Sequence, residues 1–247
     1  MKRKQLSLLL AIVSLVFIVT ASAQKQDQKW TEWSKKDAQK VLDDSPWGQI
    51  QTDTDTSQMF YSPTSDPRMT GVRDTSTTGA RIAEGATNQA VSVKFHVRLF
   101  SARPIRQALA RIIELDQKPP ADFVSKLHSF AEFKAEDSII VTVSYESNDQ
   151  RAGNSVMQAF NSAVTATLKN NTYLQRSDGK QLFLEEYVPP GKDGFGARFI
   201  FLREMDGKPF ISGSTGEVRF FAQLPGAQKI DRRFKVADLI YQGELEY

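Results

Sequence analysis

The 247-residue sequence contains no cysteine and only two histidines. Without cysteine, disulfide bonds, thiol nucleophiles, thiolate metal sites and a cysteine-linked lipid anchor are excluded. A nucleophilic triad or a metal site needs a histidine oriented by a carboxylate. His96 falls on the polar side of a strand pattern with Lys94 and Arg98, and His128 lies beside an apolar helical stripe. Nothing in the sequence pairs either one with a carboxylate, so we expect surface or core-edge histidines.

The sequence also lacks the common catalytic motifs. It has no G-x-S-x-G, no H-E-x-x-H, no Walker loop and no G-x-G-x-x-G. Ser177 and Lys180 match S-x-x-K by letter, but they lie in a predicted turn without the accompanying motifs of acyl-serine enzymes. Asp53, Asp55 and Ser57 resemble the opening of a calcium loop that lacks its glycine and glutamate. We therefore expect no catalytic residue, no metal site and no cofactor.

One enzymatic alternative stays open. The two carboxylates of a glycosidase can be far apart in sequence, so no motif excludes them. Glu185, Glu186 and Asp231 are candidates, but nothing in the sequence distinguishes them from the other acidic residues. A hydrolase that acts on envelope polysaccharide through dispersed acidic residues is therefore the alternative to a non-enzymatic protein.

The one long hydrophobic run lies at the N-terminus. Lys2, Arg3 and Lys4 precede an uncharged apolar run over residues 6–19, and the small residues Thr-Ala-Ser-Ala follow at 20–23. This pattern predicts a signal peptide over residues 1–23, cleaved after Ala23, and an exported protein that is periplasmic or extracellular. The run is shorter than the ~20 residues that cross a bilayer, so we expect no membrane span after cleavage.

The basic charge of the chain belongs to this segment. The whole chain has a formal net charge of +3, and residues 1–23 carry three basic and no acidic side chains. The remaining chain is therefore electrically balanced. This removes the global electrostatic argument for nucleic acid or an anionic membrane as a partner.

Residues 24–89 divide into an arm and a loop. Residues 24–48 form a tryptophan-rich arm, in which apolar side chains at helical spacing predict an amphipathic helix that ends before Pro46. Residues 49–89 are rich in Ser, Thr, Asp and Gly, which predicts a flexible linker or long loop. Met59-Phe60-Tyr61 is a candidate strand or docking point within it.

Residues 90–247 predict an α+β domain with a mainly antiparallel sheet and about three packed helices. The helical part, 90–170, has strands at 91–99 and 138–145, and helices that start at Pro104, after Pro119-Pro120 and near 153, the last running to 168. Residues 171–247 predict a C-terminal β-meander of short strands at 173–174, 182–188, 197–202, near 210, and at 218–224, 234–236 and 239–245. The strand at 197–202 has apolar residues at both odd and even positions, which predicts that both of its faces are covered.

The tryptophans are the first candidate binding residues. Trp30, Trp33 and Trp47 are the only three in the chain and all lie in the arm. Aromatic side chains of exported proteins can stack on sugar rings or anchor a partner. The alternative, which the amphipathic spacing favours, is that they are buried where the arm docks on the main domain.

Three arginines are the second candidate. Arg98, Arg103 and Arg106 cluster where the first strand of the domain meets its first helix. They could hold an anionic group of a ligand or partner. A solvated helix start is the alternative that we favour.

Several short motifs resemble an uncharacterised family of exported proteins from Acidobacteria-like bacteria. The resemblance spans nearly all of the chain after residue 23, and its motifs are Trp30-x-x-Trp33-Ser34-Lys35-Lys36-Asp37-Ala38, Leu42-x-x-Ser45-Pro46-Trp47, Ser101-Ala102-Arg103-Pro104, Phe234-Lys235-Val236 and Tyr241-x-Gly243-x-Leu245-Glu246-Tyr247. No activity is assigned to that family. The resemblance therefore implies export and transfers no site residues.

These observations favour an exported, non-enzymatic envelope or periplasmic protein that binds or scaffolds an envelope protein or a glycan. Besides the hydrolase, a third class is an assembly subunit, in which residues 239–247 are an open edge strand that pairs with another chain. An exposed apolar or aromatic patch favours the binding protein, and convergent acids with raised pKa values favour the hydrolase.

Overall fold

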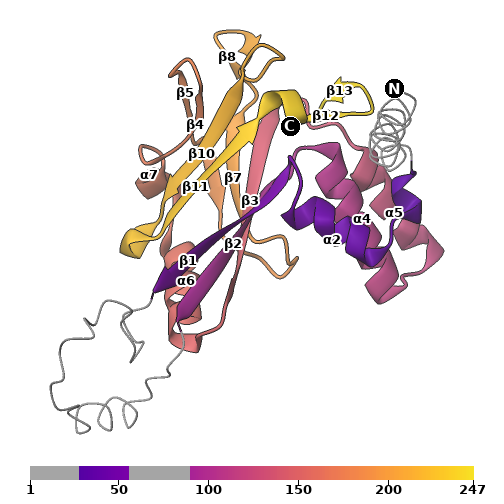
Figure 1. The fold of residues 1–247 in the computed structure, drawn as a ribbon, viewed down its shortest axis with the longest axis horizontal. Coiled ribbons are helices and arrows are strands. Elements are labelled where there is room, and N and C mark those ends of the chain that lie inside the picture. Colours follow the sequence, from indigo (N-terminus) through magenta and orange to yellow (C-terminus); the bar gives the residue numbers. More distant parts are fainter. Residues whose placement is uncertain (1–27, 56–89) are drawn as a thin grey trace, which may run out of the picture.

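A five-stranded and a four-stranded antiparallel sheet face each other in the computed structural model, which describes residues 28–55 and 90–247 (Figure 1). The predicted signal peptide, the rest of the predicted loop at 56–89 and Met59-Phe60-Tyr61 lie outside these residues. The α+β class and the mainly antiparallel pairing are confirmed.

The five-stranded sheet has the strand order β1-β2-β3-β7-β6. Its strands are β1 (Gly48–Asp55), β2 (Val91–Leu99), β3 (Ser138–Ser147), β7 (Ala197–Leu202) and β6 (Glu186–Val188). The four-stranded sheet has the order β11-β10-β4-β5, and its strands are β11 (Lys229–Lys235), β10 (Glu217–Gln223), β4 (Thr172–Arg176) and β5 (Gln181–Phe183). Two small hairpins join β8 (Glu204–Met205) to β9 (Lys208–Pro209) and β12 (Ile240–Tyr241) to β13 (Glu244–Leu245).

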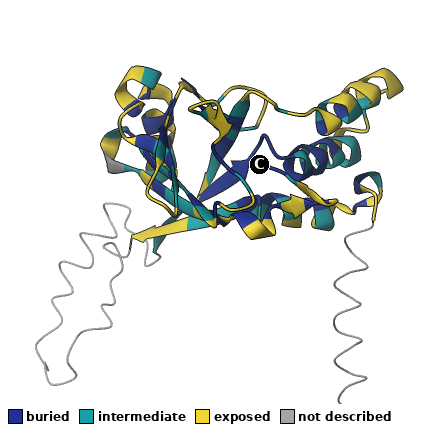
Figure 2. Cartoon of the chain, turned by 90° about the horizontal axis from the view of Figure 1, so that it is seen from above, coloured by how far each residue is buried: buried dark blue, intermediate teal, exposed yellow. Residues whose placement is uncertain are grey.

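The core lies between the two sheets. Phe199 and Phe201 of β7 contact Phe220 of β10, with ring centroids 5.3 and 6.3 Å apart. Helix α6 (Gln150–Ser162) extends the core, because its Phe160 packs on Phe95 and Tyr145 of the larger sheet. Figure 2 shows the buried segments in the middle of the molecule, where strands and helices meet.

A group of helices packs beside the larger sheet (Figure 1). The chain enters it through the 3-10 turn η1 (Trp30–Glu32) and α2 (Lys35–Asp43), and α2 packs on α4 (Arg103–Gln117), which packs on α5 (Ala121–Glu132). Ser34 caps α2, since its Oγ accepts a hydrogen bond from the Asp37 N–H at 3.2 Å. Helix α4 ends at Lys118 in the left-handed conformation, directly before Pro119-Pro120. The short elements that remain are α7 (Thr165–Leu168), η2 (Pro225–Ala227) and η3 (Val236–Asp238).

The predicted loop at 49–89 begins with a strand instead. Residues 48–55 pair with β2 along the whole length of β1, although the segment is polar. Gly48 makes the entry possible, because a Cβ atom there would lie 2.2 Å from the Leu42 carbonyl oxygen. The free edge of β2 supplied a pairing partner that composition alone did not reveal.

Other predicted elements are divided in the structure. The predicted helix at 153–168 splits into α6 and α7 at Ala163, and Val164 is 53% exposed rather than inward. The predicted strand at 182–188 splits into β5 and β6, which belong to different sheets. Residues 171–247 are therefore not a simple meander, because β6 and β7 join the larger sheet.

Strand β7 and the C-terminal segment also differ from expectation. Strand β7 buries only alternate residues, and Leu202 is 52% exposed, so one of its faces is open. Residues 239–247 do not form one edge strand, because β12 and β13 fold back on each other as a two-stranded hairpin. The Tyr247 hydroxyl donates to the Ile211 carbonyl at 2.9 Å, which fixes the end of the chain in the core.

A candidate binding face on the four-stranded sheet

The three tryptophans lie where the arm contacts the domain. Each is only 8% exposed. The Trp30 indole N–H donates to Glu132 of α5 at 2.8 Å, and that of Trp47 donates to the Glu246 carbonyl at 2.9 Å. The amphipathic face of the arm is thus its docking face, and the tryptophans are structural contacts rather than a surface for a ligand.

The three arginines are each held by groups of the protein itself. Arg98 is 8% exposed and forms an ion pair with Asp43 at 2.8 Å. Arg103 forms ion pairs with Glu246 at 3.0 Å and Glu244 at 3.3 Å. Arg106 is 3% exposed and donates to the carbonyl oxygens of Phe100, Ser101 and Phe133, and burial lowers its pKa. They form neither a shared anion site nor a solvated helix start.

Both histidines are paired with carboxylates that the sequence did not indicate. His96 Nδ1 lies 2.8 Å from Asp43 Oδ1, and His128 Nε2 lies 2.6 Å from Glu114 Oε1. Burial raises the pKa of Asp43, but hydrogen bonds from His96 and Arg98 outweigh it and hold that pKa well below its usual range. In the described residues neither imidazole contacts a serine or threonine hydroxyl, so neither pair is extended into a triad.

The outer face of the four-stranded sheet carries two ordered rows of side chains. Inward residues of these strands, such as Leu174 and Phe220, are buried in the core, and their neighbours point outward. Strand register aligns one polar row and one largely aromatic row, each crossing all four strands: Arg233, Arg219, Gln175 and Gln181 in the first, and Asp231, Phe221, Tyr173 and Phe183 in the second.

The aromatic row is a continuous series of ring contacts. Tyr173 stacks on Phe221 with centroids 5.1 Å apart and an angle of 22° between the planes. It meets Phe183 edge to face at 6.1 Å. Phe183 is 45% exposed, and Tyr173 and Phe221 are partly exposed. Cross-strand aromatic pairs stabilise a sheet, and here they also give solvent an apolar strip across it.

Paired charges border the aromatic strip. Arg219 donates to both carboxylate oxygens of Asp231, at 2.7 and 2.5 Å, and this hydrogen bonding lowers the pKa of Asp231. The guanidinium of Arg219 and the ammonium of Lys229 lie 5.2 and 5.3 Å from the centroid of Phe221. A hollow of about 240 Å³ opens at the Arg219 end of the face and includes Gln175.

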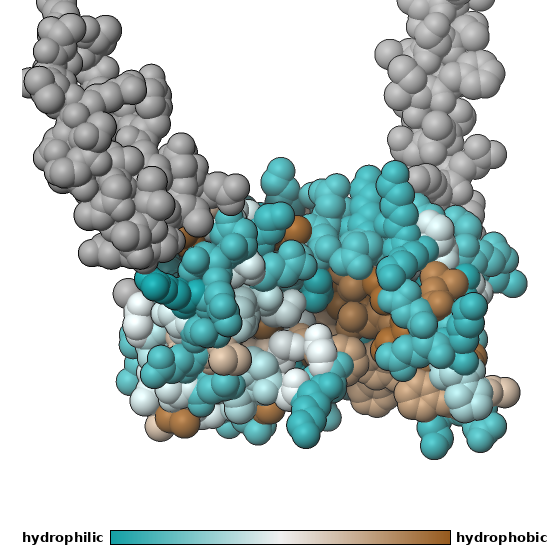
Figure 3. All heavy atoms as spheres, turned by 90° about the horizontal axis from the view of Figure 1, so that it is seen from below, coloured by the Kyte–Doolittle hydropathy of each residue, from teal (hydrophilic) through white to brown (hydrophobic). Residues whose placement is uncertain are grey.

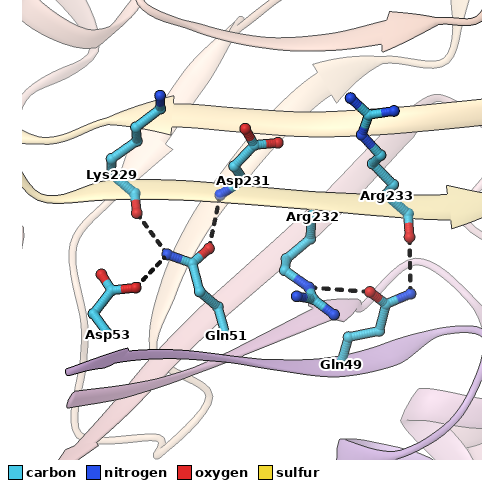
Figure 4. Close-up of a pocket in the computed structure, with 7 residues that line it drawn as sticks. All are labelled: Gln49, Gln51, Asp53, Lys229, Asp231, Arg232 and Arg233. Atoms are coloured by element: carbon cyan, nitrogen blue, oxygen red, sulfur yellow. Dashed lines mark hydrogen bonds between the residues drawn. The ribbon is translucent and has the colours of Figure 1, made fainter. Parts of the chain in front are cut away.

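A second hollow, of about 550 Å³, follows the seam between β11 and β1 (Figure 4). Two glutamines of β1 bridge this seam. The Gln51 side-chain amide donates to the Lys229 carbonyl at 2.7 Å and accepts from the Asp231 N–H at 2.9 Å. The Gln49 amide donates to the Arg233 carbonyl at 2.9 Å and accepts from Arg232 Nε at 3.1 Å. The seam adjoins the outer face through the residues of β11.

A separate hydrophobic surface lies on another side of the molecule. Figure 3 shows hydrophobic residues gathered in a hollow between the helices and the strands. Phe195, in the loop before β7, stacks on Phe130 of α5 and contacts Phe100, with centroids 6.1 and 5.3 Å away. These rings join the helices to the strands.

Comparison with protein-family models, curated proteins and solved structures finds no match to this chain. Among the residues that the structure describes, no helix is both long and apolar enough to cross a membrane. Within the same residues, no group of three or more potential ligands is placed to hold a metal ion.

The sequence analysis missed the candidate face although a signal for it was present. These strands were predicted from apolar runs and turn signals, without assigning which of their residues point outward. Tyr173, Phe183 and Phe221 occupy outward positions, where a solvated strand needs no aromatic ring. The register that aligns them into one row depends on pairings between distant strands, which no local pattern specifies.

Proposed function

We propose that this chain is an exported, non-enzymatic protein that binds a glycan of the cell envelope on the outer face of its four-stranded sheet. Export rests on the signal-peptide pattern of residues 1–23. The observation that carries the binding function is the alignment of an aromatic row beside a polar row across all four strands.

The two rows match the chemistry of a sugar chain. A pyranose ring has C–H groups on its faces and hydroxyl groups around its edge. The rings of Tyr173, Phe183 and Phe221 can pack on the C–H faces, and the amides of Gln175 and Gln181 offer donors and acceptors to the hydroxyls. Four strands span roughly 14 Å, which is long enough for a short oligosaccharide to lie across them.

The alternatives have less support. A glycosidase needs a carboxyl group whose pKa is raised so that it can act as an acid. The pKa values of Asp43 and Asp231 are both lowered, and Asp231 is paired with Arg219. The assembly subunit depended on a single edge strand over residues 239–247, which the structure divides into the two short strands of a hairpin.

Aromatic substitutions on the face test the proposal. The protein, isolated from expressing cells, is titrated with purified envelope polysaccharide in a calorimeter. We expect the wild type to bind and Tyr173→Ser or Phe221→Ser to weaken binding about tenfold or more, since each removes a ring from the centre of the strip. Thermal unfolding of each variant is followed in parallel, because the same rings stabilise the sheet.

The structure offers a matched control. Phe123 on α5 is 44% exposed and Phe183 is 45% exposed, so the same Phe→Ser change removes similar surface at two distant places. Phe183→Ser should weaken binding and Phe123→Ser should not. Wild-type protein that binds no envelope polysaccharide, or equal effects of the two variants, would show that the face is not a glycan site.

A further inference from the structure

Two neighbouring side-chain amides of the polar row face solvent. They belong to Gln175 of β4 and Gln181 of β5, which strand register places directly opposite each other. Both are partly exposed and point outward, because they alternate along their strands with the buried Leu174 and Leu182. In the part of the chain that the structure describes, neither amide makes a hydrogen bond. Each therefore offers a free carbonyl oxygen and a free NH2 group to a ligand.

These two amides adjoin the apolar strip. The next outward residues of the same two strands are Tyr173 and Phe183, which also lie opposite each other and meet edge to face at 6.1 Å. Outward residues that are two apart in a strand lie roughly 7 Å from each other. A sugar ring that packs on the aromatic pair therefore directs the substituents of one edge toward the two amides.

A hollow beside Gln175 gives room for such a substituent. The hollow has a volume of about 240 Å³ and is lined by Gln175, by Ser177 and Gly179 of the turn between β4 and β5, and by residues of β10 and β11. It is smaller than the roughly 300–1,000 Å³ of sites that enclose a complete small ligand. We therefore expect it to take one substituent of a longer chain.

The charges around the hollow are balanced. Each charged residue that lines it forms an ion pair with a neighbour: Arg176 with Asp178, Arg219 with Asp231, and Arg233 with Glu217. Charges that are already paired at a surface attract a further ion only weakly. The hollow therefore favours an uncharged substituent over a carboxylate or an amine.

An acetamido group is an uncharged sugar substituent that matches the two amides. Its N–H and its carbonyl oxygen lie on opposite edges of a planar unit, so it needs an acceptor and a donor from two separate partners. Gln175 and Gln181 supply one each, and the rings of Tyr173 and Phe183 can contact its methyl group. A hydroxyl group has no methyl group to place and is too small to fill the hollow.

We infer that the outer face selects a glycan whose sugars carry N-acetyl groups, and that Gln175 and Gln181 bind the acetamido group. This inference rests on the proposed function and assigns its ligand class. One glutamine accepts from the acetamido N–H and the other donates to the acetamido carbonyl, while the pyranose ring lies on Tyr173 and Phe183.

The test compares two oligosaccharides with the same backbone. Cellotetraose and N-acetylchitotetraose are linked alike and differ in one substituent of each sugar, a hydroxyl group in the first and an acetamido group in the second. Each is titrated into the wild-type protein in a calorimeter. We expect N-acetylchitotetraose to bind about tenfold more tightly, the effect of two neutral hydrogen bonds. Added salt should leave its affinity unchanged, because the ligand carries no charge.

Substitution of the glutamines makes the assignment specific. Gln175→Ala or Gln181→Ala should weaken binding of N-acetylchitotetraose about fivefold and leave binding of cellotetraose nearly unchanged. Gln223→Ala is the matched control, since Gln223 points outward on β10 at the other side of the aromatic row and already donates to the Gln228 carbonyl at 3.4 Å. It should change neither affinity. Thermal unfolding checks that each variant is folded, and the wild-type comparison decides the ligand class without any variant.

The outcomes separate the two proposals. If both tetrasaccharides bind equally and Tyr173→Ser weakens both, the glycan site stands and the N-acetyl specificity is wrong. The same holds if only the envelope polysaccharide binds. If no glycan binds, both proposals are wrong. If the preference for N-acetylchitotetraose persists in full in Gln175→Ala and Gln181→Ala, the acetamido group is recognised elsewhere and its assignment to these amides is overturned.

Discussion

The indole of Trp47 donates a hydrogen bond to the carbonyl of Glu246, which joins the arm to the C-terminus across 199 residues of chain. The ring also meets Tyr241 edge to face, with centroids 5.9 Å apart. A single side chain thus connects α2, the start of β1 and the C-terminal hairpin. All three tryptophans are buried in this way, because each lies where the arm packs on the domain.

Replacing this tryptophan should destabilise the whole fold. Trp47→Phe keeps an aromatic ring but leaves the Glu246 carbonyl without its donor, which costs about 1–3 kcal/mol of unfolding free energy. Chemical denaturation followed by circular dichroism measures the change. Trp33→Phe is a useful comparison and should cost less, since among the described residues no hydrogen bond involves the Trp33 indole N–H. Equal losses would show that packing rather than the hydrogen bond matters at Trp47.

Stability should fall in acid because of Asp43. Its folded-state pKa lies below its unfolded-state value of about 3.9, so its contribution is present above that value and is lost as the pH falls below it. Unfolding free energies measured between pH 7 and pH 3 should decline at the acidic end. Asp43→Asn should be less stable near neutral pH and show a shallower decline. An unchanged decline in the variant would assign the acid sensitivity to other carboxylates.

Gly48 should tolerate no side chain. A Cβ atom there would lie 2.2 Å from the Leu42 carbonyl oxygen and 2.8 Å from that of Val41. Gly48→Ala should therefore force α2 and β1 apart and cost about 1–3 kcal/mol, as overpacking does elsewhere. Gly213→Ala serves as the control, because nothing lies within 4 Å of a Cβ atom at that position. Thermal unfolding of the two variants should differ by several degrees.

The glutamines of the seam should also keep the protein from associating with itself. At the edge of β11 that faces away from β10, the backbone N–H of Asp231 and the carbonyl of Lys229 are hydrogen-bonded to Gln51. The carbonyl of Arg233 at the same edge is hydrogen-bonded to Gln49. Without the glutamine amides, the edge of β11 is open to another strand. The double variant Gln49→Ala/Gln51→Ala should show concentration-dependent association in sedimentation velocity. Gln175→Ala, on the open face of the same sheet, should sediment like the wild type.

The sequence predicted the elements whose pattern is local. Alternation identified β2 and β3, and helical spacing with prolines identified α4 and α5. It failed where distant pairing decides the outcome: the polar β1 is a strand because β2 lies beside it, and β5 and β6 separate because their partners are in different sheets.

The candidate site likewise depends on pairing between distant strands, which the sequence did not predict. The residues predicted as candidates from the sequence, such as Trp30 and Arg106, make contacts within the fold. Tyr173, Phe221 and Phe183 become a row only through the register of β4, β10 and β5. Register between segments dozens of residues apart is a property of the folded chain, and spacing along the sequence does not encode it.

The change of sheet between β5 and β6 has a mechanical consequence. Leu184 donates its N–H to the carbonyl of Thr172 in the four-stranded sheet, and the next residue, Glu185, donates its N–H to the carbonyl of Ile200 in the five-stranded sheet. Two adjacent residues are therefore fixed to different sheets, which leaves no slack for a hinge at this point. A pull on β5 is therefore transmitted directly to β7 and the strands behind it. The two sheets should resist and yield together, as a single body under tension.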